Sequence, residues 1–264
     1  MSTAAINNPA PAAAMPRIFR HPILRFWGSS VGLKLIMATT GAGLSAFVLI
    51  HMLGNLQIFQ GAESLDAYGK LLHMEPAVLW GARLSLLGMV GLHIWAYLVL
   101  TGKIYKAQPK VVGRPTKKRE STWASRSMRI SGPLLLAFIV YHILHLTTGS
   151  VHPDYHEGSV YANLVTGLRV IPVAVIYVAS MALLGLHLWH GVWSMFQTLG
   201  TNQGRFGSPG RYFATAFTVV VVGGFAVVPI AVATGFIKPP PANKIQENGK
   251  SHEADSPNLP KAPG

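Results

Sequence analysis

Five long apolar stretches constrain the fold of this 264-residue chain more than any other feature of its sequence. They cover roughly residues 31–55, 77–101, 130–149, 169–198 and 212–237. A helix that crosses a membrane needs about 20 predominantly apolar residues, whereas the strands of an outer-membrane barrel have about ten residues and alternate in polarity. The sequence therefore predicts an all-α integral membrane protein, a bundle of five transmembrane helices within residues 31–237.

The composition limits the chemistry that such a bundle can perform. Charged residues make up 12% of the chain, about half of the roughly 25% found in soluble proteins. The chain has no cysteine, which excludes disulfides, iron–sulfur clusters, cysteine-ligated zinc and thiol nucleophiles. Histidine is therefore the main candidate for ligand chemistry.

The distribution of lysine and arginine predicts the orientation, because these residues are retained on the cytoplasmic side. The N-terminal segment 1–30 and the loop 102–129 are basic, whereas the loops 56–76 and 150–168 carry more acidic than basic residues. We expect a bacterial inner-membrane protein with a cytoplasmic N-terminus and an external, disordered tail, residues 238–264. The basic loop suits anionic lipid, so we expect no nucleic-acid partner despite the net charge of +13.

Six histidines lie inside the predicted spans: His51, His93, His142, His145, His187 and His190. An ionisable residue inside a membrane is costly and is by default a functional hypothesis. An interhelical hydrogen bond is the alternative for any single one of them. Four of the five helices carry at least one, which favours a shared function.

The heights of these histidines in the membrane sort them into two levels. His51 and His142 lie toward the external ends of the first and third helices. His93 lies toward the cytoplasmic end of the second helix, as does either His187 or His190 of the fourth. At a rise of 1.5 Å per residue, the levels are about 10–15 Å apart. Two imidazoles are too few for a bare metal ion but suit a haem, whose porphyrin supplies four ligands, so the sequence predicts two stacked b haems.

Spacing alone leaves the ligand on two helices open. Counting from the helix ends favours His142 over His145 and slightly favours His190 over His187. Helix boundaries read from sequence are uncertain by two to four residues. The choice in the fourth helix therefore needs other evidence.

Five motifs resemble those of one known family. They are LIHMLGNL at 49–56, GLHI at 91–94, STWASRSM at 121–128, FIVYHILHLT at 138–147 and GLHLWHGVWS at 185–194. Together they resemble the five-helix, dihaem cytochrome b subunit, of the b558 type, of bacterial succinate dehydrogenases and fumarate reductases. In that family an arginine precedes the third-helix ligand by thirteen residues, as Arg129 precedes His142. A glycine and an aromatic–serine pair follow the fourth-helix ligand, which matches Gly191 and the Trp-Ser pair at 193–194 when His187 is the ligand.

The resemblance thus implies that His51 and His142 bind one haem iron and that His93 and His187 bind the other. Arg129 and Arg126 are candidates for binding the haem propionates. Both arginines also fit the ordinary basic residues of the cytoplasmic side.

The resemblance further implies a membrane-anchor and electron-transfer subunit of a succinate:quinone oxidoreductase, the respiratory complex II of the tricarboxylic acid cycle. A flavoprotein subunit and an iron–sulfur subunit would dock on the cytoplasmic face, and the two haems would pass electrons to menaquinone. Three other functions remain open on the sequence. They are a cytochrome b subunit of another membrane dehydrogenase, such as one for formate or hydrogen, a haem-free transporter with proton-relaying histidines, and a purely structural anchor.

Overall fold

The computed structural model describes residues 22–107, 123–200 and 209–241. Within these ranges every regular element is a helix. Five helices are long and apolar enough to cross a membrane: α2 (Ser30–Asn55), α4 (Pro76–Lys106), α5 (Trp123–Leu146), α7 (Ile171–Thr198) and α8 (Pro209–Ala233). The structure thus has the number of candidate spans that the sequence predicts.

The observed helix ends differ from the expected ones where polar residues continue a helix past its apolar part. α4 runs to Lys106 rather than to residue 101, and α5 begins at Trp123 rather than at 130. A 3-10 helix, η2 (Leu56–Gln60), extends α2. Residues 1–21, 108–122 and 242–264 lie outside the described residues, so the expectations for the first 21 residues, the basic loop and the tail beyond 241 are not described structurally.

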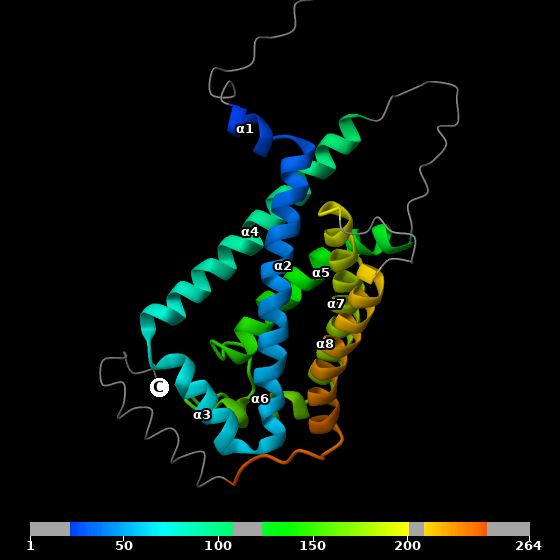
Figure 1. Ribbon diagram of the computed structural model, residues 1–264. Coiled ribbons are helices and arrows are strands. Elements are labelled where there is room, and N and C mark those ends of the chain that lie inside the picture. The colour runs from blue at the N-terminus through cyan, green and yellow to red at the C-terminus, as the bar shows by residue number, and fades with distance from the viewer. Residues whose placement is uncertain (1–21, 108–122, 201–208, 242–264) are drawn as a thin grey trace, which may run out of the picture.

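Three short helices lie outside the long ones: α1 (Pro22–Trp27), α3 (Ala62–His73) and α6 (Val160–Arg169). Figure 1 shows α1 at one end of the bundle and α3 and α6 at the opposite end. We call these ends the α1 end and the α3–α6 end. From sequence, the two segments that hold α3 and α6 are predicted to be loops, because each helix is too short and too polar on one face to resemble a span.

The long helices are packed unevenly. α2 stands centrally, with α4 packed along it on one side and α7 and α8 on the other. α5 packs along α7, and α7 and α8 run side by side. Figure 1 shows that α4 diverges from α2 toward the α3–α6 end. The pairs α4–α5 and α4–α7 do not pack closely along their described lengths.

The main buried apolar cluster lies at the α3–α6 end. It contains Ile58, Leu65, Tyr161, Leu164, Val165, Leu168, Tyr177, Val228, Ala231, Val232 and Ile237. Seven of the ten residues of α6 are buried, whereas the long helices expose many large apolar side chains, as lipid-facing helices do. This end is therefore held by a protein core, and the remaining surface of the spans suits lipid.

A buried acid joins α3 to α6. The Asp66 carboxylate accepts a hydrogen bond from the backbone N–H of Tyr161 at 2.9 Å, in the first turn of α6, where the positive end of the helix dipole favours an anion. Burial and the Asp66 charge raise the pKa of Tyr161. The Tyr161 hydroxyl stays protonated and donates to the Lys238 carbonyl at 3.0 Å, which fixes the segment after α8 against the same end.

Candidate functional site

Four histidines from four different long helices form two pairs inside the bundle. The rings of His51 in α2 and His142 in α5 have centres 5.8 Å apart and planes at 84°. The rings of His93 in α4 and His187 in α7 have centres 6.4 Å apart and planes at 51°. The structure thus brings together the four residues that the resemblance implies as ligands, in the same two pairs.

The alternative histidines take other positions. His145 follows His142 by one turn and stacks on Tyr141 and His152 instead of facing His51. His190 lies one turn beyond His187 toward the α1 end. The geometry therefore favours His142 and His187, as the family register does, although counting from the helix ends slightly favours His190.

The two pairs lie at clearly different heights, and two helices give the same spacing. In α2, Thr40 contacts His93 and lies eleven residues before His51. In α5, Ser131 contacts His187 and lies eleven residues before His142. At 1.5 Å per residue, the separation is about 16 Å. The His51–His142 pair is the one nearer the α3–α6 end.

The ring separations suit one metal ion between each pair of imidazoles. An imidazole–metal bond is about 2 Å long and the ring centre lies about 1 Å behind the nitrogen, which places the two ring centres about 6 Å apart. The observed values are 5.8 and 6.4 Å. In the described part of the chain no three His, Cys, Asp or Glu residues cluster as metal ligands. Each pair therefore fits a group that brings most of its own ligands, as a haem does.

Hydrogen bonds at Nδ1 leave Nε2 available in three of the four rings. The His93 Nδ1 lies 3.1 Å from the Thr40 hydroxyl, and Thr40 donates its own proton to the Ile36 carbonyl at 2.7 Å. Thr40 must then accept from His93, so the His93 proton is on Nδ1 and the Nε2 lone pair can bind a metal. The His187 Nδ1 similarly lies 3.3 Å from the Ser131 hydroxyl.

The His51–His142 pair has a different environment. The His142 Nδ1 lies 3.3 Å from the hydroxyl of Tyr177, while the Phe47 ring stacks on His51 with centres 5.5 Å apart. His51 is the exception in its hydrogen bond, because its Nε2 lies 3.4 Å from the side-chain nitrogen of Asn55. A metal at this Nε2 would replace that long contact, and Asn55 would keep its 2.8 Å bond to the His51 carbonyl.

The two candidate propionate ligands lie toward the α1 end of α5. The Arg129 guanidinium donates to the hydroxyl of Tyr105 in α4 at 3.3 Å and lies 6.0 Å from that ring. Arg129 precedes Ser131 by two residues and is therefore close in height to the His93–His187 pair. The side chain of Arg126 lies outside the described residues.

Sequence reasoning missed three hydroxyl residues of the site: Thr40, Ser131 and Tyr177. Threonine and serine in membrane helices commonly bond to their own backbone or to a neighbouring helix, so their presence carries little information. The spacing of eleven residues before His51 and His142 is the pattern that would have found the first two. No comparable pattern points to Tyr177.

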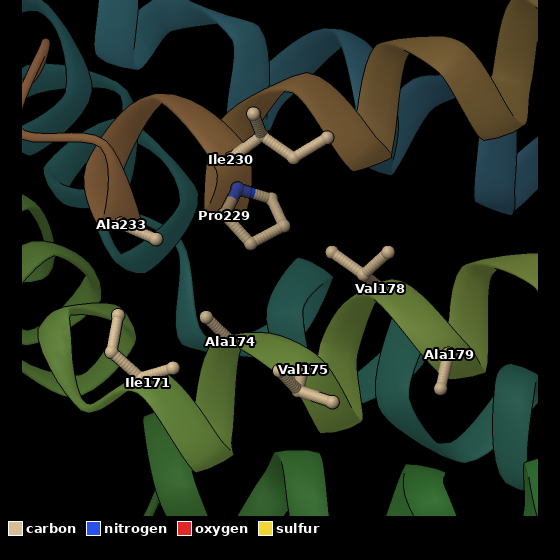
Figure 2. A pocket seen from close by; sticks show the side chains of 8 residues that line it. All are labelled: Ile171, Ala174, Val175, Val178, Ala179, Pro229, Ile230 and Ala233. Atoms are coloured by element: carbon tan, nitrogen blue, oxygen red, sulfur yellow. The ribbon is translucent and has the colours of Figure 1, made fainter.

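An apolar groove between α7 and α8 has different chemistry. Figure 2 shows its lining, which consists of Ile171, Ala174, Val175, Val178 and Ala179 from α7 and Pro229, Ile230 and Ala233 from α8. The groove has a volume of about 340 Å³. It contains no polar side chain, so it suits a hydrocarbon chain and offers no ligand to a metal or a quinone head group.

Comparison with known families adds one match. Residues 111–226 match the family model described as "Succinate dehydrogenase/Fumarate reductase transmembrane subunit". The matched region is under half of the chain and includes His142 and His187, whereas His51 and His93 precede it. No curated protein and no solved structure matches the chain. This part of the chain is therefore similar to the transmembrane subunit of succinate dehydrogenases and fumarate reductases.

Proposed function

We propose that this chain is the dihaem membrane-anchor and electron-transfer subunit of a succinate:menaquinone oxidoreductase. The observation that carries the proposal is the pair of facing imidazoles at each of two heights, with ring centres 5.8 and 6.4 Å apart. The family match, which includes one histidine of each pair, supports the complex to which the subunit belongs.

In this proposal His51 and His142 hold one b haem, and His93 and His187 hold the other. A bound b haem supplies one-electron redox chemistry. The protein's own contribution is to present an Nε2 lone pair from each side and to fix three of the rings through Nδ1, using Thr40 for His93 and other hydroxyls for His142 and His187. Aromatic and aliphatic side chains around the rings exclude water.

The distribution of charge supports an orientation for the complex. The α1 end carries Arg25, Lys34, Lys103, Lys106 and Arg129 and no acid among the described residues, whereas the α3–α6 end carries Glu63, Asp66, Glu75, Asp154 and Glu157 together with Lys70, Arg169 and Lys238. Basic residues remain on the cytoplasmic side of the bacterial inner membrane. This chain has no cysteine and so no ligands for iron–sulfur clusters, which separate subunits must supply. In the proposed arrangement the flavoprotein and iron–sulfur subunits dock at the basic α1 end. The two histidine pairs then connect that end with menaquinone.

The first test is a dithionite-reduced minus oxidised spectrum of the purified complex, with haem quantified per chain and succinate then used as the reductant. Two b haems per chain, at least one of them reduced by succinate, are expected. Two haems that succinate does not reduce would assign the subunit to another dehydrogenase. A complex without haem would contradict the proposal.

A matched pair of variants in α7 tests the ligand assignment. His187→Gln should remove one of the two haems, because the remaining histidine of its pair cannot hold the iron alone. His190→Gln changes the same residue type one turn away and should retain both. The measurement is haem per chain by pyridine haemochromogen, and loss of haem in the second variant but not in the first would reverse the assignment.

A further inference from the structure

One tyrosine hydroxyl lies between two histidines of α5. The Tyr177 Oη, contributed by α7, is 3.3 Å from His142 Nδ1 and 2.9 Å from His145 Nδ1. His145 is 0% exposed. The hydroxyl therefore joins a proposed haem ligand to a second, fully buried histidine that has no part in the proposed function.

The phenol has a single proton, and this sets the order of the hydrogen bonds. If His142 binds iron through Nε2, its remaining proton is on Nδ1 and is donated to the Tyr177 oxygen. Tyr177 then donates its own proton to His145 Nδ1. Ligation at His142 thus selects a chain of hydrogen bonds that runs from His142 through Tyr177 to His145.

The His145 ring is held in one orientation by its neighbours. It stacks between Tyr141, with ring centres 5.4 Å apart, and His152, with centres 4.9 Å apart. His152 is fixed in turn, because its Nδ1 accepts from the Asp154 N–H at 3.0 Å and its Nε2 donates to the Asn163 carbonyl at 2.8 Å.

The other nitrogen of this ring, His145 Nε2, is buried and has no hydrogen-bond partner in the described part of the chain. The Nε2 of His152 cannot accept from it, because that atom is already a donor. A buried polar atom without a partner costs free energy and requires an explanation. The hydrogen bond from the Tyr177 hydroxyl to Nδ1 explains why the His145 ring occupies this buried position.

The hydroxyls that contact the other histidine pair have different hydrogen-bond partners. Thr40 accepts from His93 and passes its own proton to the Ile36 backbone carbonyl, and Ser131 is likewise an aliphatic alcohol. Tyr177 instead donates to an imidazole nitrogen. Consecutive hydrogen bonds polarise one another, so this donation strengthens the Tyr177 oxygen as an acceptor for the ligand N–H.

We propose that Tyr177, supported by His145, is a positioning residue for the haem at the His51–His142 pair, where it fixes the His142 ring and increases its electron donation to the iron. This inference rests on the proposed function. A hydrogen-bond acceptor at the outer nitrogen makes an imidazole ligand more basic, and a more basic ligand favours ferric iron. The Tyr177 hydroxyl therefore lowers the reduction potential of this haem and leaves that of the other unchanged.

The test is a redox titration of the purified complex. The two haem transitions are followed by absorbance in the α-band and by the low-spin ferric signals in electron paramagnetic resonance spectra. His51→Ala identifies the transition of the first pair by its loss. Tyr177→Phe should keep two haems per chain and move only that transition upward, by about tenfold in the ferrous-to-ferric ratio at a fixed ambient potential, or about 59 mV for one electron. Thr40→Val, the matched control, should move only the other transition.

His145→Leu provides a second route to the same answer if Tyr177→Phe prevents assembly. It removes the acceptor of the Tyr177 proton and also the unpartnered Nε2, so the same transition should move upward by a smaller amount. Two haems with unchanged potentials, or an equal shift of both, would overturn this inference and leave the proposed function standing. A wild-type complex without two haems would instead overturn the proposed function.

Discussion

Gly167→Ala is a sharp structural perturbation at the α3–α6 end. A Cβ atom built on Gly167 in α6 would lie 2.6 Å from His145 Cε1, 2.7 Å from His145 Nε2 and 2.8 Å from His152 Nε2. Ordinary contacts between non-bonded heavy atoms are about 3.5–4.0 Å, so the two rings would have to move by about 1 Å. Neither ring is the flexible end of a long side chain.

The cost follows from what holds the two rings. Moving His152 breaks its 2.8 Å bond to the Asn163 carbonyl, and moving His145 breaks its 2.9 Å bond to Tyr177, at about 1 kcal/mol for each bond. Overpacking adds about 1–3 kcal/mol, whereas alanine in a helix regains about 1 kcal/mol relative to glycine. We therefore expect a net loss of about 2–4 kcal/mol.

The assay is thermal unfolding of the purified protein in detergent. A loss of this size lowers the melting temperature by about 2–4 °C per kcal/mol for a chain of this length. Gly223→Ala in α8 is the control, since a Cβ there meets nothing within 4 Å, and it should be neutral or slightly stabilising. In a His145→Ala background the cost of Gly167→Ala should fall, because the closest atoms are gone. An unchanged melting temperature, or an equal cost in both backgrounds, would refute the reasoning.

Two further predictions concern the α3–α6 end and the orientation of the bundle in the membrane. Asp66→Ala should destabilise the protein by about 1–3 kcal/mol, because it leaves the Tyr161 N–H buried without an acceptor. Asp66→Asn retains a side-chain oxygen and should lose less stability. Melting temperatures in detergent measure both variants, and equal losses would contradict the role of the acceptor. Because the natural chain has no cysteine, Glu157→Cys in intact cells should react with a membrane-impermeant maleimide and Ala107→Cys only after lysis, and the reverse pattern would contradict the proposed orientation.

The long helices were predictable from sequence because a span is specified by length and hydropathy alone. α7, expected over 169–198, occupies Ile171–Thr198. α6 was not predictable in the same way, because it depends on tertiary contacts. Seven of its ten residues are buried, and its first turn is capped by Asp66 from α3. Neither observation follows from the local sequence of Val160–Arg169.

The candidate site likewise has a part that the sequence predicts and a part that depends on how the helices pack. Height alone places His51 at the same level as His142, since it depends only on where each helix begins and ends. The choice between His187 and His190 depends on helix rotation, which spacing does not determine within a turn. In the structure α7 turns His187, and not His190, toward His93. The resemblance had already favoured His187, because its motif carries information about rotation that hydropathy lacks.

The least predictable part of the site lies where the short helices meet the spans. Tyr177 belongs both to the apolar cluster that includes residues of α6 and to the hydrogen bonds of His142. His145 is held by stacking on His152, which bonds to the Asn163 carbonyl in α6. The packing of α6 therefore determines how firmly Tyr177 and His145 are presented to the His51–His142 pair. The other pair, which bonds to Thr40 and Ser131 within the spans, has no such dependence. A change in α6 such as Gly167→Ala should accordingly affect the first pair and spare the second.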